Sequence, residues 1–429
     1  MNFKEYITAE SNNAINGFDS DLVKIKRADA FSHFERAGFP AKNNEEWRFT
    51  NITPIINGEF RYSPDIKISK DKISKLPEYN FDADILVIHN GKYSAELSKT
   101  NSGLKNGFIG SFREGLKKHR DIIEQHFGKY ASADADGFTA LNTSSFSDGV
   151  FIYAGSGCKI EKPVIIINFC EGAGEEVFSN TRNLIVAGKN CYADVSEVYY
   201  SAGSKSTFSN VVTEIYMDEN SELHYNKIQN ENEKGYHIGT TQVLQKNSSR
   251  LYSSTVAWGG SLLRNNLNSV IDGEGIDCYF RGLYMVKDRQ VIDNHTLADH
   301  AKPNSHSNEL YKGIMDGSGQ AIFNGKIMVR QDAQKTNAYQ TNNNILLTND
   351  ASVNSKPQLE IFADDVKCSH GATTGQINPD EVFYLRARGI SEAAAKKLLL
   401  SAYAHEIIDE IKNEELKKHL VKMLDKKLG

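Results

Sequence analysis

Val211-Val-Thr-Glu-Ile-Tyr216, followed by the polar turn Asp218-Glu-Asn-Ser221, shows the pattern that decides the fold. It is a short run of β-forming residues that ends in residues typical of turns. Comparable runs follow one another from Gly149 to Gly375 with almost no helical periodicity. Turns introduce many of them at an irregular spacing of roughly thirty residues, as stacked coils with loops of unequal length would give. Further examples of these turns are Gly188-Lys-Asn-Cys191, Lys246-Asn-Ser-Ser249, Gly273-Glu-Gly-Ile276, Gly317-Ser-Gly-Gln320 and Asn349-Asp-Ala-Ser352.

Two architectures fit this long β region: a β-sandwich made of hairpins and a parallel β-helix made of stacked coils. A sandwich requires frequent Asn-Gly or Asp-Gly hairpin turns. We favour the β-helix because such dipeptides are few, although the pattern alone leaves the sandwich open. Those present are Asp148-Gly149, Asp272-Gly273, Asp316-Gly317 and Asn324-Gly325.

The residues before the β region have a mixed character. Helical patterning covers Asp21 to Ala37 and Gly110 to Phe127. Between them, Ile85 to His89 is an apolar run followed by Asn90-Gly91, which predicts a buried strand that ends in a tight turn. We therefore expect an N-terminal mixed helical region over residues 1–135 and a β core over residues 136–378.

The last part of the chain, residues 379–429, predicts a helical domain. Ser391 and Asn413 are good helix N-caps, and an apolar residue recurs every four positions after each of them. Such stripes either dock on a partner or pack on the body of the same chain. The first stripe contains Ala395, Leu399, Tyr403, Ile407 and Ile411, and the second contains Leu416, Leu420 and Leu424.

Composition excludes several classes of protein. The net charge is −5, from 50 basic and 55 acidic residues mixed along the chain, which argues against nucleic-acid binding. The longest apolar run, Val164 to Ile167, is far too short to cross a bilayer. The five cysteines are widely spread without a CxxC pair, so we expect reduced thiols. These features predict a soluble cytoplasmic protein.

Common catalytic motifs are missing from the sequence. Gly325-Lys326 lacks the rest of a phosphate-binding loop, and the signatures of serine hydrolases, zinc proteases and dinucleotide-binding enzymes are absent. A polysaccharide-cleaving β-helix enzyme remains an alternative, with Asp364, Asp365 and Lys367 as its candidate cluster. Only Trp47 and Trp258 would supply tryptophan to a sugar groove, and Trp47 is better interpreted as an anchor for the N-terminal segment.

Cys368 and His370 form the most suggestive chemical pair. Strand alternation places residues two apart on the same face, so the thiol and the imidazole would point to one place. They could bind a soft metal, or the imidazole could lower the thiol pKa and create a sulfur acceptor. Two ligands are too few for a stable metal site, so a metal would need ligands from elsewhere. A packed thiol beside a hydrogen-bonded histidine is the alternative.

A second stretch contains His295, His300 and His306, but Pro303 interrupts it and its spacing mixes strand with loop. Histidines in stacked coils commonly satisfy neighbouring polar groups. We therefore expect structural roles for these three residues.

Several extended segments resemble one known family, the SufB/SufD proteins of the SUF iron-sulfur cluster assembly system. The resemblance covers most of the chain and is strongest in its C-terminal third. The segments are Glu46-Trp-Arg-Phe-Thr50, Tyr311-Lys-Gly-Ile-Met-Asp-Gly317, Phe323-Asn-Gly-Lys-Ile327, Pro357-Gln-Leu-Glu-Ile361, Ala363 to Thr373, and Tyr384-Leu-Arg-Ala-Arg-Gly-Ile390.

The resemblance implies a right-handed parallel β-helix core flanked by an N-terminal helical region and a C-terminal helical domain. It implies a non-catalytic subunit that works in a complex with SufB and two copies of the ATPase SufC. The short chain and the lack of clustered cysteines in its N-terminal part favour the SufD branch, with a SufB-like protein as the alternative. Isolated SufD-like chains are expected to form homodimers.

The resemblance also implies roles for particular residues. Cys368 and His370 fall at the expected SufB interface, where iron or a nascent cluster would be held transiently by both chains. No cofactor is expected to bind this chain stably by itself. The SufC contact is expected on the C-terminal helices, with Leu399, Tyr403, Ile407 and Ile411 as its candidate residues.

Overall fold

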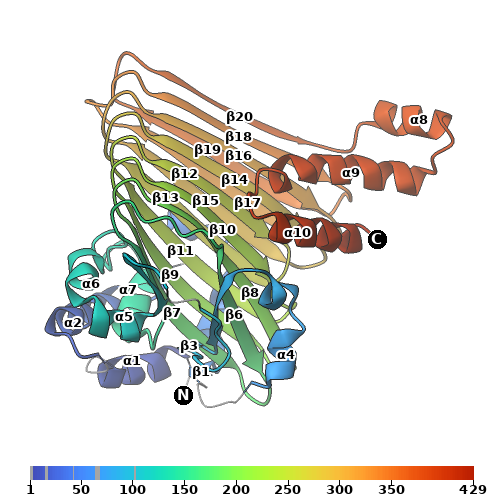
Figure 1. Ribbon diagram of the computed structural model, residues 1–429. Helices are drawn as coiled ribbons and strands as arrows, with labels where there is room; N and C mark the ends of the chain where they lie inside the picture. The colour runs from blue at the N-terminus through green and yellow to red at the C-terminus, as the bar shows by residue number, and fades with distance from the viewer. Residues whose placement is uncertain (1–2, 15–17, 42, 63–67, 101–102) are drawn as a thin grey trace.

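The computed structural model describes residues 3–14, 18–41, 43–62, 68–100 and 103–429. Its centre is a β-solenoid in which consecutive strands join two opposite sheets in turn. From β5 onward, each strand pairs in parallel with the strand two places along the chain. Figure 1 shows these coils stacked from the N-terminal region to β20. The predicted parallel β-helix with flanking helical regions is therefore confirmed.

Each sheet has ten strands. Sheet A runs in spatial order through β19 (Ser352–Ile361), β17 (Gln320–Val329), β15 (Val291–His300), β13 (Leu262–Ile271), β11 (Gly235–Gln245), β9 (Thr207–Met217), β7 (Val177–Ala187), β5 (Val150–Ala154) and β4 (Gly107–Ser111), with β1 (Arg61–Tyr62) beside β7. Sheet B runs through β20 (Lys367–Gly375), β18 (Asn337–Leu346), β16 (His306–Met315), β14 (Asp277–Val286), β12 (Arg250–Ala257), β10 (Glu222–Asn230), β8 (Tyr192–Gly203), β6 (Val164–Gly172), β2 (Asp84–His89) and β3 (Lys92–Tyr93).

A column of residues with positive φ marks one corner of the solenoid. Its members are 27 to 33 residues apart, and several are the polar turn residues that the sequence indicated. The backbone N–H of each member donates to a carbonyl in the following coil, so these turns extend the hydrogen bonding of the sheets around the corner. The residues are Gly157, Asn190, Asn220, Ser248, Gly275, Asn304 and Lys335.

Residues in neighbouring coils stack directly because the parallel strands are in register. On the outer face of sheet B, the ring of Tyr252 lies 4.7 Å from that of His224 and 5.1 Å from that of Tyr279. Inside the solenoid, apolar side chains of both sheets form one continuous core that includes Val150, Ile215 and Phe323. Burial of this core is the main force that holds the two sheets together.

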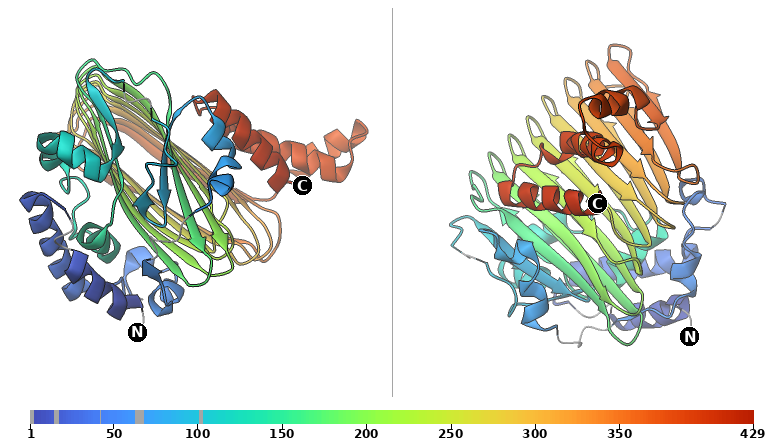
Figure 2. Two further views of the ribbon diagram at one scale, coloured as in Figure 1. Left: turned by 60° about the horizontal axis from the view of Figure 1, so that its bottom comes forward. Right: turned by 90° about the vertical axis from the view of Figure 1, so that its right-hand side faces the viewer.

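The N-terminal region covers the outer face of sheet A over the first coils (Figure 2, left). It also contributes strands: β2 extends sheet B in parallel, and β4 pairs antiparallel with β5. The predicted tight turn after β2 is present, since Asn90 and Gly91 both have positive φ before β3. Its helices are α1 (Phe3–Ala14), α2 (Asp21–Ala37), η1 (Glu45–Trp47), α3 (Thr53–Asn57), α4 (Lys70–Ser74), η2 (Pro77–Asn80), α5 (Phe112–Lys118), α6 (Arg120–His126) and α7 (Gly137–Ser145).

The C-terminal helices are α8 (Pro379–Ala387), α9 (Glu392–Ile408) and α10 (Glu414–Lys427). Ser391 and Asn413 cap α9 and α10 as predicted. Both helices lie across the outer face of sheet B (Figure 2, right), whereas α8 projects away from the solenoid (Figure 1). None of the described helices is long and apolar enough to span a membrane.

A fully buried ion pair ties the N-terminal region to the solenoid. Arg182 of β7 lies 2.6 Å from Glu214 of β9, and neither side chain is exposed. Glu214 also accepts hydrogen bonds from the backbone N–H groups of Gly128, Tyr130 and Ala131. This carboxylate therefore holds the segment after α6 against sheet A.

We predict that Glu214→Gln lowers the free energy of unfolding by about 3–5 kcal/mol, because the buried Arg182 charge loses its counterion. Urea unfolding of the full chain measures this change. The matched control is Glu219→Gln, which removes the exposed pair with Lys189 and should change stability by less than about 1 kcal/mol. Equal losses in the two variants would contradict a special role for the buried pair.

Candidate functional site

The C-terminal end of the solenoid is open. β19 and β20 are the last strands of their sheets, and each pairs with only one neighbouring strand. Most residues of β20 are exposed, and nothing in the described part of the chain adds a further strand to either edge. An uncovered strand edge presents unpaired N–H and C=O groups that can pair with another chain.

Cys368 and His370 lie on β20 at this open end. Their strand partners are Ala338 and Gln340 of β18, both buried in the solenoid interior, so the two residues share the inward face as the alternation predicted. Cys368 packs against a small apolar cluster that includes Ile327 and is partly buried, whereas His370 is exposed. The pair therefore faces the interior where the solenoid ends.

Burial raises the pKa of the Cys368 thiol above its ordinary value, whereas activation by a histidine would lower it. Among the described residues, no three His, Cys, Asp or Glu side chains converge as a metal site. At this end the described residues thus offer Cys368 and His370 as donors, and a stable metal site would require further donors.

A buried carboxyl group lies behind the pair. Glu309 of β16 accepts a hydrogen bond of 2.8 Å from the amide of Gln340, which is the strand partner of His370. Burial raises the pKa of Glu309 to about 7. Sequence reasoning missed this residue, because nothing in Asn308-Glu309-Leu310 indicates that the glutamate points inward.

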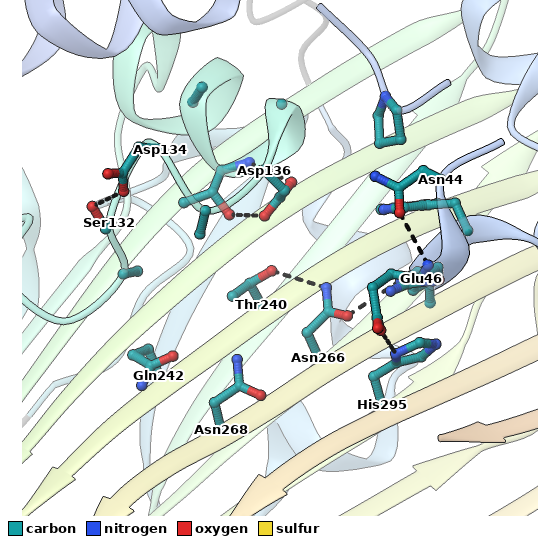
Figure 3. A pocket seen from close by; sticks show the side chains of 18 of the residues that line it. Asn44, Glu46, Ser132, Asp134, Asp136, Thr240, Gln242, Asn266, Asn268 and His295 are labelled. Carbon is teal, nitrogen blue, oxygen red and sulfur yellow. Dashed lines mark hydrogen bonds and ion pairs between the residues drawn. The ribbon is translucent and has the colours of Figure 1, made fainter. Parts of the chain in front are cut away.

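A polar groove of about 620 Å³ lies on the outer face of sheet A, between the N-terminal region and the strands (Figure 3). Its floor carries Thr240, Asn266 and His295 from β11, β13 and β15, which are adjacent strands of sheet A. Glu46 reaches the groove from the N-terminal segment. Asp134 and Asp136 precede α7 on the opposite side. The groove is thus built from parts of the chain that are far apart in sequence.

A network of ion pairs lies at one end of this groove. Asp293 bonds Arg264 at 2.8 Å and His295 at 3.0 Å, and His295 also lies 3.2 Å from Glu46. Burial alone would raise the pKa of Asp293, but the charges of His295 and Arg264 lower it to about 2. The Arg264 guanidinium lies 3.9 Å over the ring of Trp47. Trp47 is therefore held by packing, as expected of an anchor.

The structure also places the other candidate residues that the sequence indicated. The Nε2 atom of His300 lies 2.8 Å from Ser307 Oγ, and burial lowers the pKa of this histidine to about 3. His306 lies between the rings of Tyr279 and Tyr339. All five cysteines are free thiols, as expected. Asp364 and Asp365 are exposed in the turn between β19 and β20 and do not line the 620 Å³ groove.

The C-terminal stripe requires a correction. The structure buries Ile407 and Ile411 against this chain's own sheet B, so they offer no surface to a partner. Leu399 and Tyr403 are partly buried, and the Tyr403 hydroxyl donates to the carbonyl of Asn343. The large apolar side chains exposed on α8 and α9 are instead Phe383, Tyr384 and Leu398.

Comparisons with known proteins agree on one family. The family model described as "SUF system FeS cluster assembly, SufBD core domain" matches residues 169–403, and that of the "SufBD protein N-terminal region" matches residues 3–166. A SufBD family protein of Synechocystis is 32% identical over 423 residues, covering 95% of this chain and 92% of the relative. SufD of Escherichia coli is 31% identical, covering 92% and 90%. SufD of Bacillus subtilis is 25% identical, covering 95% and 94%.

We predict that Glu309→Gln changes the pH dependence of stability. The folded state of the wild type binds the Glu309 proton more tightly than the unfolded state, so wild-type stability falls as pH rises from about 4.5 to about 7. The variant has no ionisable group at this position and therefore lacks this fall in stability with pH. Between pH 5 and pH 8 its stability relative to wild type should rise by roughly 2–3 kcal/mol, measured by urea unfolding. A constant difference across this range would contradict the assignment.

Proposed function

This chain belongs to the SufB/SufD family of iron-sulfur cluster assembly proteins, and we propose that it is a SufD-type scaffold that pairs with SufB and binds the SufC ATPase. Relatives named SufD match over more than nine-tenths of the chain, which supports this branch over a SufB-like protein. In this role the chain has no catalytic centre of its own. ATP hydrolysis by the neighbouring subunit supplies the energy for changes in its position.

The observation that carries the proposal is the open end of the solenoid. A family partner with the same kind of end can continue one or both sheets across the interface, strand edge against strand edge. The exposed Phe362 and Ile361 add apolar surface at this end. When SufB is absent, a second copy of this chain occupies the same edge and forms a homodimer.

Cys368 and His370 lie within this proposed interface. Because one chain supplies too few ligands for a stable metal site, the two chains share the site. Iron or a nascent cluster is the substrate of the site, held by Cys368, His370 and donors of the partner chain. Metal binding must displace the thiol proton, which is held more tightly here because burial raises the pKa of Cys368.

SufC is proposed to bind the exposed surface of α8 and α9. Phe383 and Tyr384 are 71% and 58% exposed, and Leu398 is 52% exposed. Large apolar side chains exposed together on one helical arm are typical of interaction sites. Because α9 and α10 pack on sheet B, movement of the ATPase would reach the strands of the solenoid directly.

We predict that the double change Phe383→Ala and Tyr384→Ala weakens SufC binding by about 2 kcal/mol or more, because it removes the most exposed aromatic anchors of the arm. Titration calorimetry with the purified ATPase measures the affinity. The control is Ile25→Ala, which removes a side chain of similar exposure (61%) on α2. Unchanged binding by the aromatic variant would refute this contact.

We also predict that Cys368→Ser combined with His370→Ala abolishes most cluster formation by the reconstituted complex while the complex still assembles, because the substrate loses both donors of this chain. Absorbance of the cluster gives the yield, and size-exclusion chromatography tests assembly. Cys158→Ser, at another partly buried free thiol, is the control and should leave the yield unchanged. Equal yields from the double variant and wild type would remove these residues from the site.

A further inference from the structure

A second cavity, of about 780 Å³, lies where the strands of sheet B end beneath α10. Its wall is mostly apolar and includes Trp258, Met285 and Ile314 from the solenoid, with Leu400 and Met423 from the helices. The volume lies in the range of pockets that bind small molecules, roughly 300–1,000 Å³. Neither Cys368 nor His370 lines this cavity, and the exposed Phe383, Tyr384 and Leu398 do not line it either.

The rim of this cavity is strongly cationic. Four lysines line it: Lys287 from the turn after β14, and Lys422, Lys426 and Lys427 from α10. None of them forms an ion pair with a carboxylate in the described parts of the chain. Asp316 is the one acidic residue of the described lining, and it accepts the backbone N–H of Gly317. This concentration of positive charge occurs in a chain whose net charge is −5.

Trp258 connects the apolar wall with the cationic rim. It is only 2% exposed, and its Nε1 donor has no hydrogen-bond partner in the structure described. Lys427 donates to the Trp258 carbonyl at 2.7 Å, and its ammonium lies 5.8 Å from the indole ring. A buried donor without a partner costs free energy, so an acceptor that entered the cavity could offset that cost.

We propose that this cavity binds an amphipathic anion, whose apolar body lies against Trp258 and Met285 and whose phosphate, sulfonate or carboxylate head meets Lys287, Lys422 and Lys426. An apolar wall rewards an aromatic or acyl body by removing it from water. Unpaired lysines at the mouth attract an anionic head and form charge-assisted hydrogen bonds with it. The inference concerns the isolated chain and does not depend on the SufB and SufC contacts.

The fluorescence of Trp258 can report ligand binding to the cavity. The chain has two tryptophans, so Trp47→Phe leaves Trp258 as the only indole reporter. We expect saturable changes in its fluorescence when the full-length variant is titrated with anilinonaphthalene sulfonate or with dodecanoate. These two probes distinguish an aromatic body from an acyl one, and a response to either supports the proposal. Dodecanol has only the apolar body, and inorganic phosphate has only the anionic head. Each of them should therefore bind at least tenfold more weakly than the better anion.

Charge variants test the rim. Lys422→Gln combined with Lys426→Gln should weaken the better anion roughly tenfold, because two charge-assisted contacts are lost. The control is Lys418→Gln, an exposed lysine of the same helix that does not line the cavity and should not affect binding. No saturable binding by either anion, equal binding of dodecanol, or equal weakening by the control variant would overturn the proposal. Circular dichroism of each variant checks that it is folded.

Discussion

The structure depends on one constraint: every backbone N–H and C=O group of a coil must find its partner in the coil before or after it. Parallel strands in register meet this constraint within the sheets, and the column of positive-φ turn residues continues the hydrogen bonding around a corner. A stack of this kind has two ends where the requirement fails. At the first end, β2, β3 and β4 supply further strands, and the antiparallel pairs stop the repeat. At the other end, β19 and β20 stay open, which is where Cys368 and His370 lie.

The two outer faces of the solenoid are used differently. Sheet A carries the N-terminal region over its first coils, and buried charges fix that contact: Arg182 with Glu214, and Asp293 with both Arg264 and His295. Such pairs are costly to bury and costly to break, so they specify position more than they add stability. Sheet B instead carries α9 and α10 through an apolar contact. This contact leaves α8 projecting freely and creates the lysine-rimmed cavity beneath α10.

A scaffold role fits this division of surfaces. The open edge, the helical arm and the groove involve different residues, so the partners proposed for the edge and for the arm would not compete. α9 packs on sheet B, and β20 is the last strand of the same sheet. The solenoid thus joins the proposed ATPase contact to the proposed assembly site through continuous hydrogen-bonded structure.

The sequence by itself determined the local features, because their causes lie within a few residues. The turns at Asn190 and Asn220, the strand ending at Asn90-Gly91, the caps Ser391 and Asn413, and the shared face of Cys368 and His370 could all be read from it. Motifs spread over most of the chain also identified the family. Only the tertiary structure decided which surfaces pack within this chain. The stripe with Ile407 and Ile411 looks the same whether it packs on another protein or on its own sheet, and packing on sheet B settled the matter. Likewise, Glu309 acquires a raised pKa, and Trp258 joins Lys427, only because the coils bring together residues that no local pattern relates.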